Sequence, residues 1–496
     1  YRRAIALKPD LWSARAQLGI NLMRLGIEEE AREHLEMCYA NGHKDKPTTN
    51  TLTLMDSYKN FVTFKTPTSI LRLHKKEADI LKPYLEGELL RAIATYEKKY
   101  KMRLDRPVQL EVYPDHEDFA VRTMGMPGLG ALGVTFGHVV AMDSPSGRRP
   151  GSFHLASTLW HELSHVFVLA ATKHRVPRWF TEGMAVHEES AASPDWGDRL
   201  DPHAIGAIKK KQLLPIAELD RGFVRQSYPG QVIVSYFQAG RICDYITEHW
   251  GYHKLLDMMH AYAAGADTPE VVEKHLGMKP EEFDKRFLSS LESATRKAVD
   301  GFDEWRKQIR KLGDLAKAKK HDDVIVEGLA MRDIYPDYVE AGSVYELMAD
   351  AYAAKGEKAK ATAELERYSR IGGRDPFVIK KLATLLEEAG RKKEAAGALA
   401  RLNLIHPIDE ELHRRLGALR QALGDRPQAI LELQAVVAMK PLDPASAYYN
   451  LAKAYHEAGR TKEAQDSLFS ALESAPGYRP AQKLLLELTE GGNPKK

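Results

Sequence analysis

Apolar and polar positions alternate with different periods along the chain, and residues from about 59 to 300 combine a strand-like pattern with a helical one. Short runs with apolar content or period-two alternation predict strands over 61–64, 108–113 and 133–142. An amphipathic stretch predicts one long helix from about residue 69 to 100, and from residue 153 the pattern is helical almost to residue 300. A small sheet followed by a helical half predicts an α+β domain.

A second pattern repeats at the two ends of the chain. Towards the C-terminus, glycine recurs every 34 or 35 residues, at Gly356, Gly390, Gly424 and Gly459. Each glycine is followed five positions later by an alanine and preceded eight positions earlier by a large apolar residue. The last three glycines are also followed 17 positions later by a proline. Glycine permits a tight turn between two helices, alanine lets the helices approach, and proline ends the second helix. The register recurs near the N-terminus at Leu18, Gly26 and Ala31.

A period of 34 with these fixed positions resembles tetratricopeptide repeats, which are all-α. We therefore expect repeats over residues 1–58, truncated at the start, a separate domain over 59–300, and further repeats over 301–496, beginning with a degenerate one from about 308 to 336. The resemblance implies a protein partner bound through the repeats. The first residue is Tyr1, inside a helical pattern, so we expect an N-terminally truncated or processed chain whose targeting signal or anchor is missing.

Composition limits the classes of function. The 496 residues are 44% hydrophobic and 28% charged, as in soluble globular proteins, and no apolar run approaches the roughly 20 residues that span a bilayer. A net charge of +3 does not indicate a nucleic-acid partner, and we interpret the run 209–211 as a solvated face. Two cysteines, Cys38 and Cys243, exclude a disulfide framework. So few cysteines fit a cytosolic protein and a bacterial envelope protein equally, which leaves the compartment open; of the two we expect the bacterial cell envelope or secretion rather than the cytoplasm.

The segment 158–167 carries the first chemical signal. It contains His161-Glu162-Leu163-Ser164-His165, and Glu162 is its only charged residue. On a helix, residues four apart share a face, so His161 and His165 can hold one zinc ion. Glu162 can then reach a water on that ion and take its proton as general base.

Zinc needs a third protein ligand, and the next predicted helix offers Glu182. It follows His165 after 16 intervening residues, which is enough for the chain to turn back towards the metal. Gly183 and Ala185 flank the carboxylate with small residues, and we expect them to let this helix pack closely against the first one.

His-Glu-x-x-His followed by Trp-Phe-Thr-Glu-Gly-x-Ala-x-x-x-Glu is similar to the gluzincin metallopeptidases with thermolysin-like zincin domains, and most of all to bacterial peptidase MA-like domains. The resemblance implies Zn²⁺ as cofactor, His161, His165 and Glu182 as metal ligands, and Glu162 as catalytic base. It also implies Glu189 as an acid that orients a ligand histidine, although a solvated helix acid remains an alternative. His187 is expected to point away from the ligand face.

Two further elements follow from the resemblance. Residues 128–136 occupy the place of an edge strand that pairs with extended substrate, but they lack the acid with which aminopeptidases of this class hold a free amine. This absence favours an endopeptidase. A tyrosine that stabilises the oxyanion is expected near Ser235-Tyr236-Phe237. We choose Tyr236 for this role, with Tyr228 in reserve and a core tyrosine as the alternative.

The sequence thus predicts a zinc-dependent peptidase, an endopeptidase by preference, whose substrate is a peptide or protein. Two alternatives stay open: an inactive scaffold whose repeats mediate protein interactions, and a zinc amidase that acts on a non-peptide substrate. A base beside a complete ligand set argues against the scaffold, because a structural zinc site needs no base. The amidase stays open because the same site polarises any carbonyl.

Overall fold

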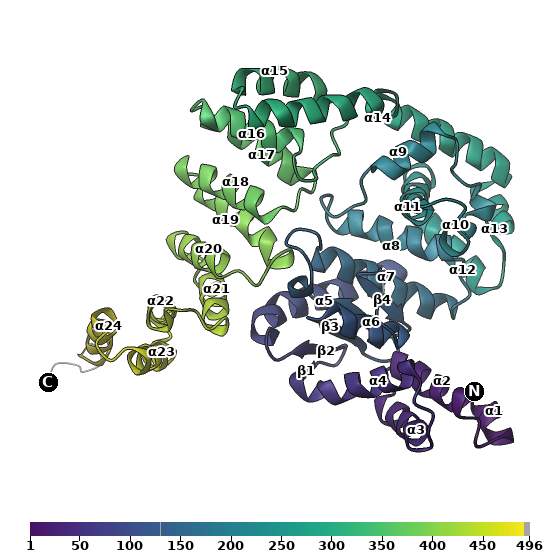
Figure 1. Ribbon diagram of the computed structural model, residues 1–496, viewed down its shortest axis with the longest axis horizontal. Coiled ribbons are helices and arrows are strands. Elements are labelled where there is room, and N and C mark those ends of the chain that lie inside the picture. The colour runs from purple at the N-terminus through teal and green to yellow at the C-terminus, as the bar shows by residue number, and fades with distance from the viewer. Residues whose placement is uncertain (129, 491–496) are drawn as a thin grey trace.

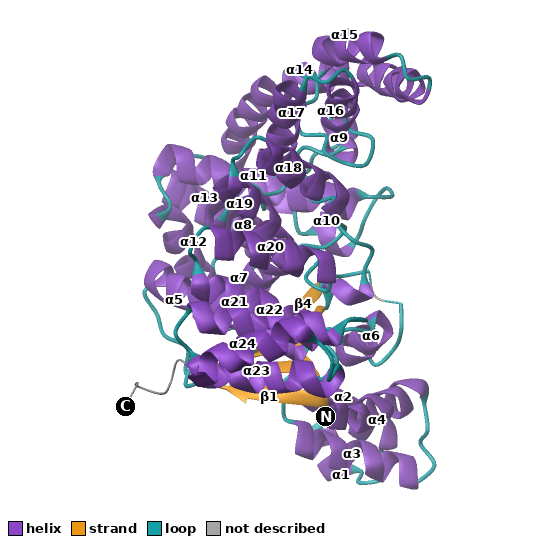
Figure 2. Cartoon of the chain, turned by 90° about the vertical axis from the view of Figure 1, so that its left-hand side faces the viewer, coloured by secondary structure: helices purple, strands orange, loops and turns teal. Residues whose placement is uncertain are grey.

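A small mixed sheet lies within a mostly helical chain. The computed structural model describes residues 1–128 and 130–490. The strands are β1 (Phe61–Lys65), β2 (Ser69–His74), β3 (Val108–Tyr113), β4 (Gly133–Phe136) and β5 (Val139–Asp143). Their order is β1-β2-β3-β5-β4, with β2, β3 and β5 parallel and the two edge strands antiparallel to their neighbours. Figure 2 shows how small this sheet is beside the surrounding helices.

The sheet confirms the strand predicted over 108–113 and corrects two other predictions. Residues 69–74 form β2 rather than the first turns of a long helix, which begins only at Ala78. Leu71 and Leu73 are buried whereas Arg72 between them is only partly buried, so pairing with β1 and β3 decides an ambiguous apolar pattern. The single strand predicted over 133–142 is two strands, because Gly137 has a φ of 61° and turns the chain between them.

Helices make up the rest of this central part, as the pattern after residue 153 predicted. They are α5 (Ala78–Tyr100), α6 (His116–Met124), α7 (Leu155–Thr172), α8 (Arg178–Ala192), α9 (Pro202–Lys209), α10 (Arg221–Val224), α11 (Gln231–Trp250), α12 (His253–Ala263), α13 (Thr268–Leu276) and α14 (Pro280–Lys317). Short 3₁₀ helices occur at Tyr58–Asn60, Pro145–Gly147, Ile216–Glu218 and Arg401–Leu404. The expected boundary between residues 300 and 301 falls inside α14, which continues from the central part into the repeats.

Helix pairs occupy both ends of the chain. The N-terminal helices are α1 (Arg2–Leu7), α2 (Trp12–Arg24), α3 (Glu28–Ala40) and α4 (Lys46–Ser57). The C-terminal helices after α14 are α15 (His321–Met331), α16 (Val344–Ala354), α17 (Lys358–Arg370), α18 (Pro376–Glu388), α19 (Lys392–Ala400), α20 (Glu410–Ala422), α21 (Arg426–Ala438), α22 (Pro444–Glu457), α23 (Thr461–Ser474) and α24 (Arg479–Glu490).

The repeated glycines and alanines do what their spacing predicted. Each recurring glycine lies between the two helices of a pair with φ between 74° and 79°, a left-handed conformation that glycine adopts without strain. The recurring alanines Ala361, Ala395, Ala429 and Ala464 are fully buried. Both features therefore serve the close packing of paired helices.

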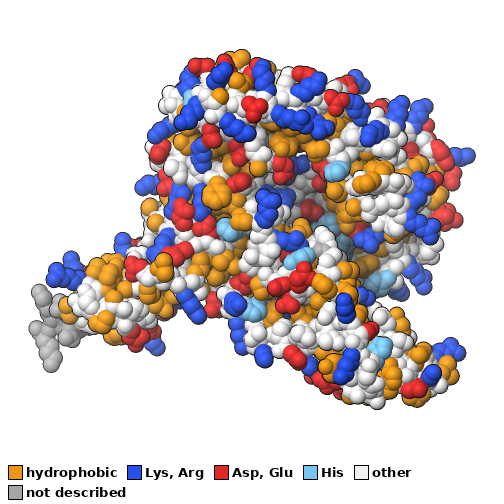
Figure 3. All heavy atoms as spheres, in the orientation of Figure 1, with side chains coloured by type: hydrophobic (Ala, Val, Ile, Leu, Met, Phe, Trp, Pro, Cys, Tyr) orange, Lys and Arg blue, Asp and Glu red, His pale blue; other side chains and the backbone are white. Residues whose placement is uncertain are grey.

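The C-terminal repeats curve round the central part and touch it again. In Figure 1, helices α14 to α21 form an arch that returns to α5, while α22 to α24 extend away from it. The hydroxyl of Tyr84 on α5 donates to Glu432 on α21 at 3.1 Å, which ties the far end of the arch to the central part. Figure 3 shows that the molecule is hollowed between the arch and the central part.

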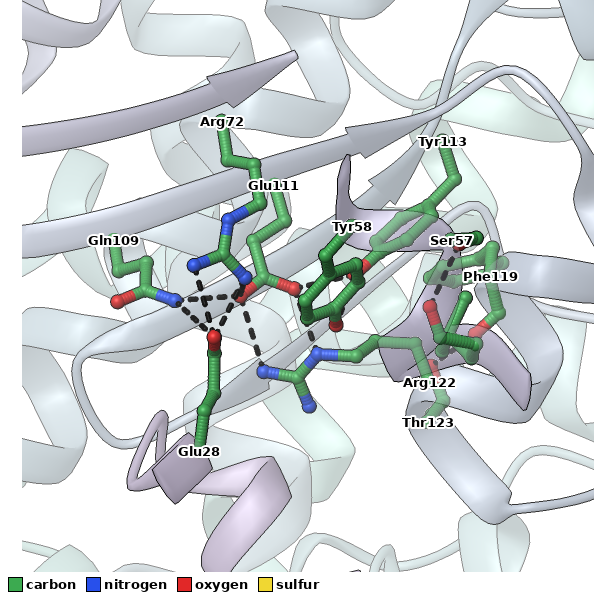
Figure 4. Close-up of polar contacts among 11 residues, drawn as sticks. Glu28, Ser57, Tyr58, Arg72, Gln109, Glu111, Tyr113, Phe119, Arg122 and Thr123 are labelled. Atoms are coloured by element: carbon green, nitrogen blue, oxygen red, sulfur yellow. Dashed lines mark hydrogen bonds and ion pairs between the residues drawn. The ribbon is translucent and has the colours of Figure 1, made fainter. Parts of the chain in front are cut away.

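A buried cluster of charges joins the N-terminal repeats to the sheet (Figure 4). Glu111 on β3 accepts two hydrogen bonds from the buried guanidinium of Arg122, at 2.7 and 3.2 Å, and one from the hydroxyl of Tyr113 at 2.6 Å. Arg72 on β2 lies beside Glu111 and binds Glu28 of the repeat helix α3 through two hydrogen bonds. Burial opposes the charge of Glu111, but Arg122 and Arg72 outweigh it and lower the pKa of Glu111 to about 2.

Glu111→Gln is expected to lower the free energy of unfolding by about 3–5 kcal/mol, because the change leaves Arg122 buried without its counter-charge. Chemical denaturation at pH 7 measures this loss. Since the folded-state pKa of Glu111 is depressed, its contribution is complete above about pH 4.5 and is lost as the pH falls towards 2. The matched control is Glu29→Gln, at an exposed position of α3, where a change within about 0.5 kcal/mol is expected. Equal stabilities of the two variants would contradict the importance of the cluster.

Candidate metal centre and cleft

Helices α7 and α8 bring His161, His165 and Glu182 to one point. The side chain of His154 caps the start of α7, and Pro177 precedes α8, so both helices begin at defined residues. Oε2 of Glu182 lies 3.3 Å from Nε2 of His161 and 3.2 Å from Nε2 of His165. One ligand atom from each residue falls within 4.8 Å of the others, so the three residues could hold a metal ion.

The other ring nitrogen of each histidine is held by a second side chain. Nδ1 of His161 lies 2.7 Å from Oε1 of Glu189, and Nδ1 of His165 lies 2.8 Å from Oγ1 of Thr181. These contacts orient both rings so that Nε2 faces Glu182. Glu189 thus lies where the sequence analysis expected an orienting acid, whereas nothing in the sequence pattern pointed to Thr181.

The two carboxylate oxygens of Glu182 have different surroundings. Arg178 donates to Oε1 at 3.1 Å, while the buried Oε2 has no hydrogen-bond partner among the described residues. Burial opposes a charge here, yet the neighbouring histidines hold the pKa of Glu182 well below its usual value. Two imidazole nitrogens that face one buried carboxylate oxygen form a donor set that suits zinc.

Glu162 lies against the edge strand β4. Its Oε2 accepts a hydrogen bond from the hydroxyl of Thr135 at 2.6 Å, and the same hydroxyl lies 3.0 Å from its backbone oxygen. A Cβ on Gly133 would lie only 2.7 Å from Cγ of Glu162, so the strand approaches this carboxylate as closely as a residue without a side chain allows. Thr135 and Gly133 therefore fix the position of Glu162.

Tyr236, on α11, faces the same space, and its ring centroid lies 6.2 Å from that of His161. Burial raises the pKa of its hydroxyl, and the charge of Glu182 adds to the rise. Tyr228 does not line the cleft, and its hydroxyl is buried without a partner among the described residues. His187 lies away from the metal ligands, with Nδ1 at 2.7 Å from Asp244.

One packing expectation for α8 is wrong. Gly183 faces α11 rather than α7, since a Cβ there would lie 2.6 Å from the backbone oxygen of Ala239 and 2.9 Å from Sγ of Cys243. The small residue next to Glu182 therefore sets the distance between α8 and α11. Leu129, within the expected substrate-binding stretch, lies outside the described residues.

The cleft extends to both sides of Glu162 as two cavities. One, of about 600 Å³, runs past β4 and is lined by Arg24 of the repeat helix α2. The other, of about 410 Å³, runs towards the loop between α8 and α9 and is lined by Tyr335 and Tyr338 from the C-terminal repeats. Sequence reasoning missed these repeat residues, because only the packing of distant segments brings them to the cleft.

Comparison with known proteins finds a family for part of the chain. A sequence model described as the Peptidase MA superfamily matches residues 90–293, which include β3, β4, β5 and the helices that carry the candidate site. The match supports a Peptidase MA superfamily domain over these residues, combined with helical repeats. No curated protein sequence matches the chain.

Two solved structures with some likeness to part of the chain are YrrB and MamA. YrrB, described as a TPR protein with an unusual peptide-binding site, is 20% identical over 38% of this chain and 97% of its own, with a TM-score of 0.30. MamA from Desulfovibrio magneticus RS-1 is 22% identical over 30% of this chain and 83% of its own, with a TM-score of 0.26. Among the described residues of the present chain, the helices are all too short or too polar to cross a membrane.

Proposed function

We propose that the protein is a zinc-dependent peptidase of the gluzincin type, with a thermolysin-like catalytic domain and an endopeptidase specificity. The observation that carries the proposal is the buried Oε2 of Glu182, which faces Nε2 of both His161 and His165 and accepts no hydrogen bond from the residues that the structure describes. In this proposal the three residues hold the zinc ion. The bound ion supplies a Lewis acid that polarises a carbonyl group and lowers the pKa of a water molecule.

Glu162 acts as the general base. It accepts the proton of the attacking water and later delivers it to the leaving amine. Its Oε2 is engaged by Thr135, whereas no hydrogen bond to Oε1 occurs among the described residues, so Oε1 has its lone pairs available. The hydrogen bond from Thr135 keeps the carboxylate in one orientation, which a general base needs.

Tyr236 donates a hydrogen bond to the substrate oxygen as negative charge develops on it. The raised pKa of the phenol keeps it protonated at neutral pH, so it can act as a donor. The nearby side chain of Arg178 interacts with both Tyr236 and Glu182 and adds positive charge on this side of the cleft.

An extended peptide fits the cleft best. β4 is an edge strand, so its outer side can pair with a substrate backbone, and cavities continue on both sides of Glu162. A cleft with room on both sides of the base suits cleavage within a chain. The helical repeats, in this proposal, bind or position a protein partner, as stacked helical repeats do.

Glu162→Gln is expected to abolish hydrolysis of an unfolded protein while the zinc content stays near one ion per chain, because the amide cannot accept the proton and Glu162 is not a ligand. Zinc analysis and a cleavage assay with and without a chelator measure the two effects. Glu182→Ala is expected to lose zinc instead. Near-normal turnover in Glu162→Gln would refute the mechanism, and full zinc affinity in Glu182→Ala would refute the ligand set.

Tyr236→Phe is expected to reduce turnover by roughly 10²–10³-fold with little change in substrate binding, because the hydrogen bond strengthens only in the transition state. Steady-state kinetics, zinc content and thermal unfolding of the same preparation distinguish this effect from misfolding. Tyr228→Phe is the matched control and should retain turnover. An unchanged rate in Tyr236→Phe would show that this tyrosine only packs.

Gly133→Ala is expected to lower turnover by about 10²-fold, because the added Cβ displaces the Glu162 side chain by a fraction of an ångström or more. Gly130→Ala, in the same segment, is the control, since a Cβ there meets nothing within 4 Å. Turnover is measured for both variants at equal zinc content. If Gly133→Ala were as active as Gly130→Ala, the close contact between β4 and Glu162 would not matter for catalysis.

A further inference from the structure

Arg24, the last residue of α2, reaches the cavity of about 600 Å³ that runs past β4. Its side chain is partly buried and held in two ways. Nε donates a hydrogen bond to the backbone oxygen of Thr123 on α6 at 2.8 Å, and the guanidinium carbon lies 5.5 Å from the ring centroid of Phe136. A cationic group from the N-terminal repeats is therefore fixed in the wall of the cavity.

The outer nitrogens of this guanidinium are available to a ligand. Nη1 makes one long contact, 3.4 Å to Oδ1 of Asn21, and Nη2 makes no hydrogen bond among the described residues. No carboxylate forms an ion pair with Arg24 in the part of the chain that the structure describes. A guanidinium anchored at Nε keeps its fork of N–H groups in one position, and this fork matches the two oxygens of a carboxylate.

The other charged groups of the same cavity have roles already. Arg178 forms an ion pair with Glu182 at 3.1 Å, and Glu182 is a proposed metal ligand. Glu162 is the proposed base, and Thr135 holds it. Arg24 is the remaining cation among the described residues that line this cavity, and no acid of the protein neutralises it. A negatively charged group of a substrate would supply the missing counter-charge.

The edge strand β4 presents two faces to a peptide that pairs with it. Thr135 faces Glu162, so Phe136, the next residue along the strand, faces the other side of the sheet. Arg24 covers the ring of Phe136 on that side. Side chains of a paired peptide also alternate between the two faces, so every second one is directed to the side of Arg24.

The cavity on the other side of Glu162 offers no comparable excess of positive charge. One of its walls is the loop between α8 and α9, residues 193–201, which carries acids beside an arginine. The C-terminal repeats hold this loop through an ion pair between Arg401 and Asp195 at 2.9 Å and a hydrogen bond from the hydroxyl of Tyr335 to the backbone oxygen of Leu200. A carboxylate is therefore expected on the β4 side of the cleft.

We propose that Arg24 binds a carboxylate of the peptide substrate, in a subsite where the N-terminal repeats meet the edge strand β4. The inference rests on the proposed peptidase function, because it assigns the substrate preference of that cleft. The carboxylate belongs either to an acidic side chain or to the carboxyl terminus of the peptide. The two sources share one chemistry and differ in the position at which the chain is cut.

The test is a binding measurement on the full chain carrying Glu162→Gln, loaded with zinc. The probes are four acetylated peptide pools of equal length, with uncharged residues at the randomised positions. Three are amidated and have a central glutamate, glutamine or lysine; the fourth has a central glutamine and a free carboxyl terminus. The glutamate pool or the free-carboxylate pool is expected to bind roughly tenfold or more tightly than the amidated glutamine pool, as one charge-assisted contact implies.

The comparison of pools needs no substitution at Arg24, and two results of it would overturn the proposal. One is equal binding of the glutamate, free-carboxylate and amidated glutamine pools. The other is tighter binding of the lysine pool than of the glutamate pool, since a cation would then be preferred in the cleft.

Adding Arg24→Gln should remove the preference, while Arg24→Lys, which keeps the charge, should retain part of it. Both variants lose the hydrogen bond from Nε to Thr123, so a purely structural role of Arg24 would be lost equally in both. Arg3→Gln, at an exposed position of α1, is the matched control and should keep the full preference. Zinc content and thermal unfolding are measured for every variant.

Two results with these variants would overturn the proposal. A preference that survives Arg24→Gln would assign the carboxylate to the zinc ion or to Arg178. A preference lost as completely in Arg24→Lys as in Arg24→Gln would show that Arg24 acts only by packing α2 against α6.

Hydrolysis of the same pools by the unaltered protein separates the two proposals. Cleavage without any dependence on the carboxylate would overturn the subsite and leave the peptidase function intact. Binding that depends on the carboxylate and on Arg24, without cleavage of any pool, would overturn the peptidase function and leave the subsite. Mapping the cut positions by mass spectrometry assigns the carboxylate to an acidic side chain or to the carboxyl terminus.

Discussion

The contact on which the candidate site depends is the meeting of Glu182 with His161 and His165. A carboxylate at this depth is costly unless positive charge or a metal compensates it. Arg178, also on α8, donates a hydrogen bond to Oε1 of Glu182. The other oxygen, Oε2, faces the Nε2 atoms of the two histidines on α7. Other contacts support this arrangement: Glu189 and Thr181 orient the histidines, and β4 holds Glu162, the proposed base, beside them.

Local patterns predicted the parts of this arrangement that depend on one or two helices. Spacing of four residues placed both histidines on one face, and the following helix offered Glu182 as the candidate third ligand. Residues 69–74 were wrongly expected to be helical, since six residues with apolar positions fit either a buried strand or a helix turn, and only pairing with β1 and β3 decides. The roles of Thr135 and Thr181 could not be predicted from the sequence. A threonine shows its function only through the group that its hydroxyl contacts, and these contacts depend on the fold.

The repeats contribute to the cleft itself. Arg24 reaches it from the N-terminal repeats, while Tyr335 and Tyr338 reach it from the C-terminal arch. The buried cluster around Glu111 fixes the first of these segments to the sheet, and the contacts of the 193–201 loop fix the second to the domain. A partner that moved either set of repeats would thus change the walls of the cleft without contacting the proposed metal ligands.

The distance between α8 and α11 determines how Glu182 and Tyr236, two groups of the proposed site, lie relative to each other. Gly183 on α8 lies against the backbone of α11, and Gly240 on α11 lies against Val186 of α8, where a Cβ would come within 2.5 Å of that side chain. Glu182 immediately precedes the first glycine, and Tyr236 lies one helical turn before the second. A larger residue at either glycine would push α8 and α11 apart and move Glu182 away from Tyr236. The two glycines therefore belong to the site as much as the groups that would touch the substrate.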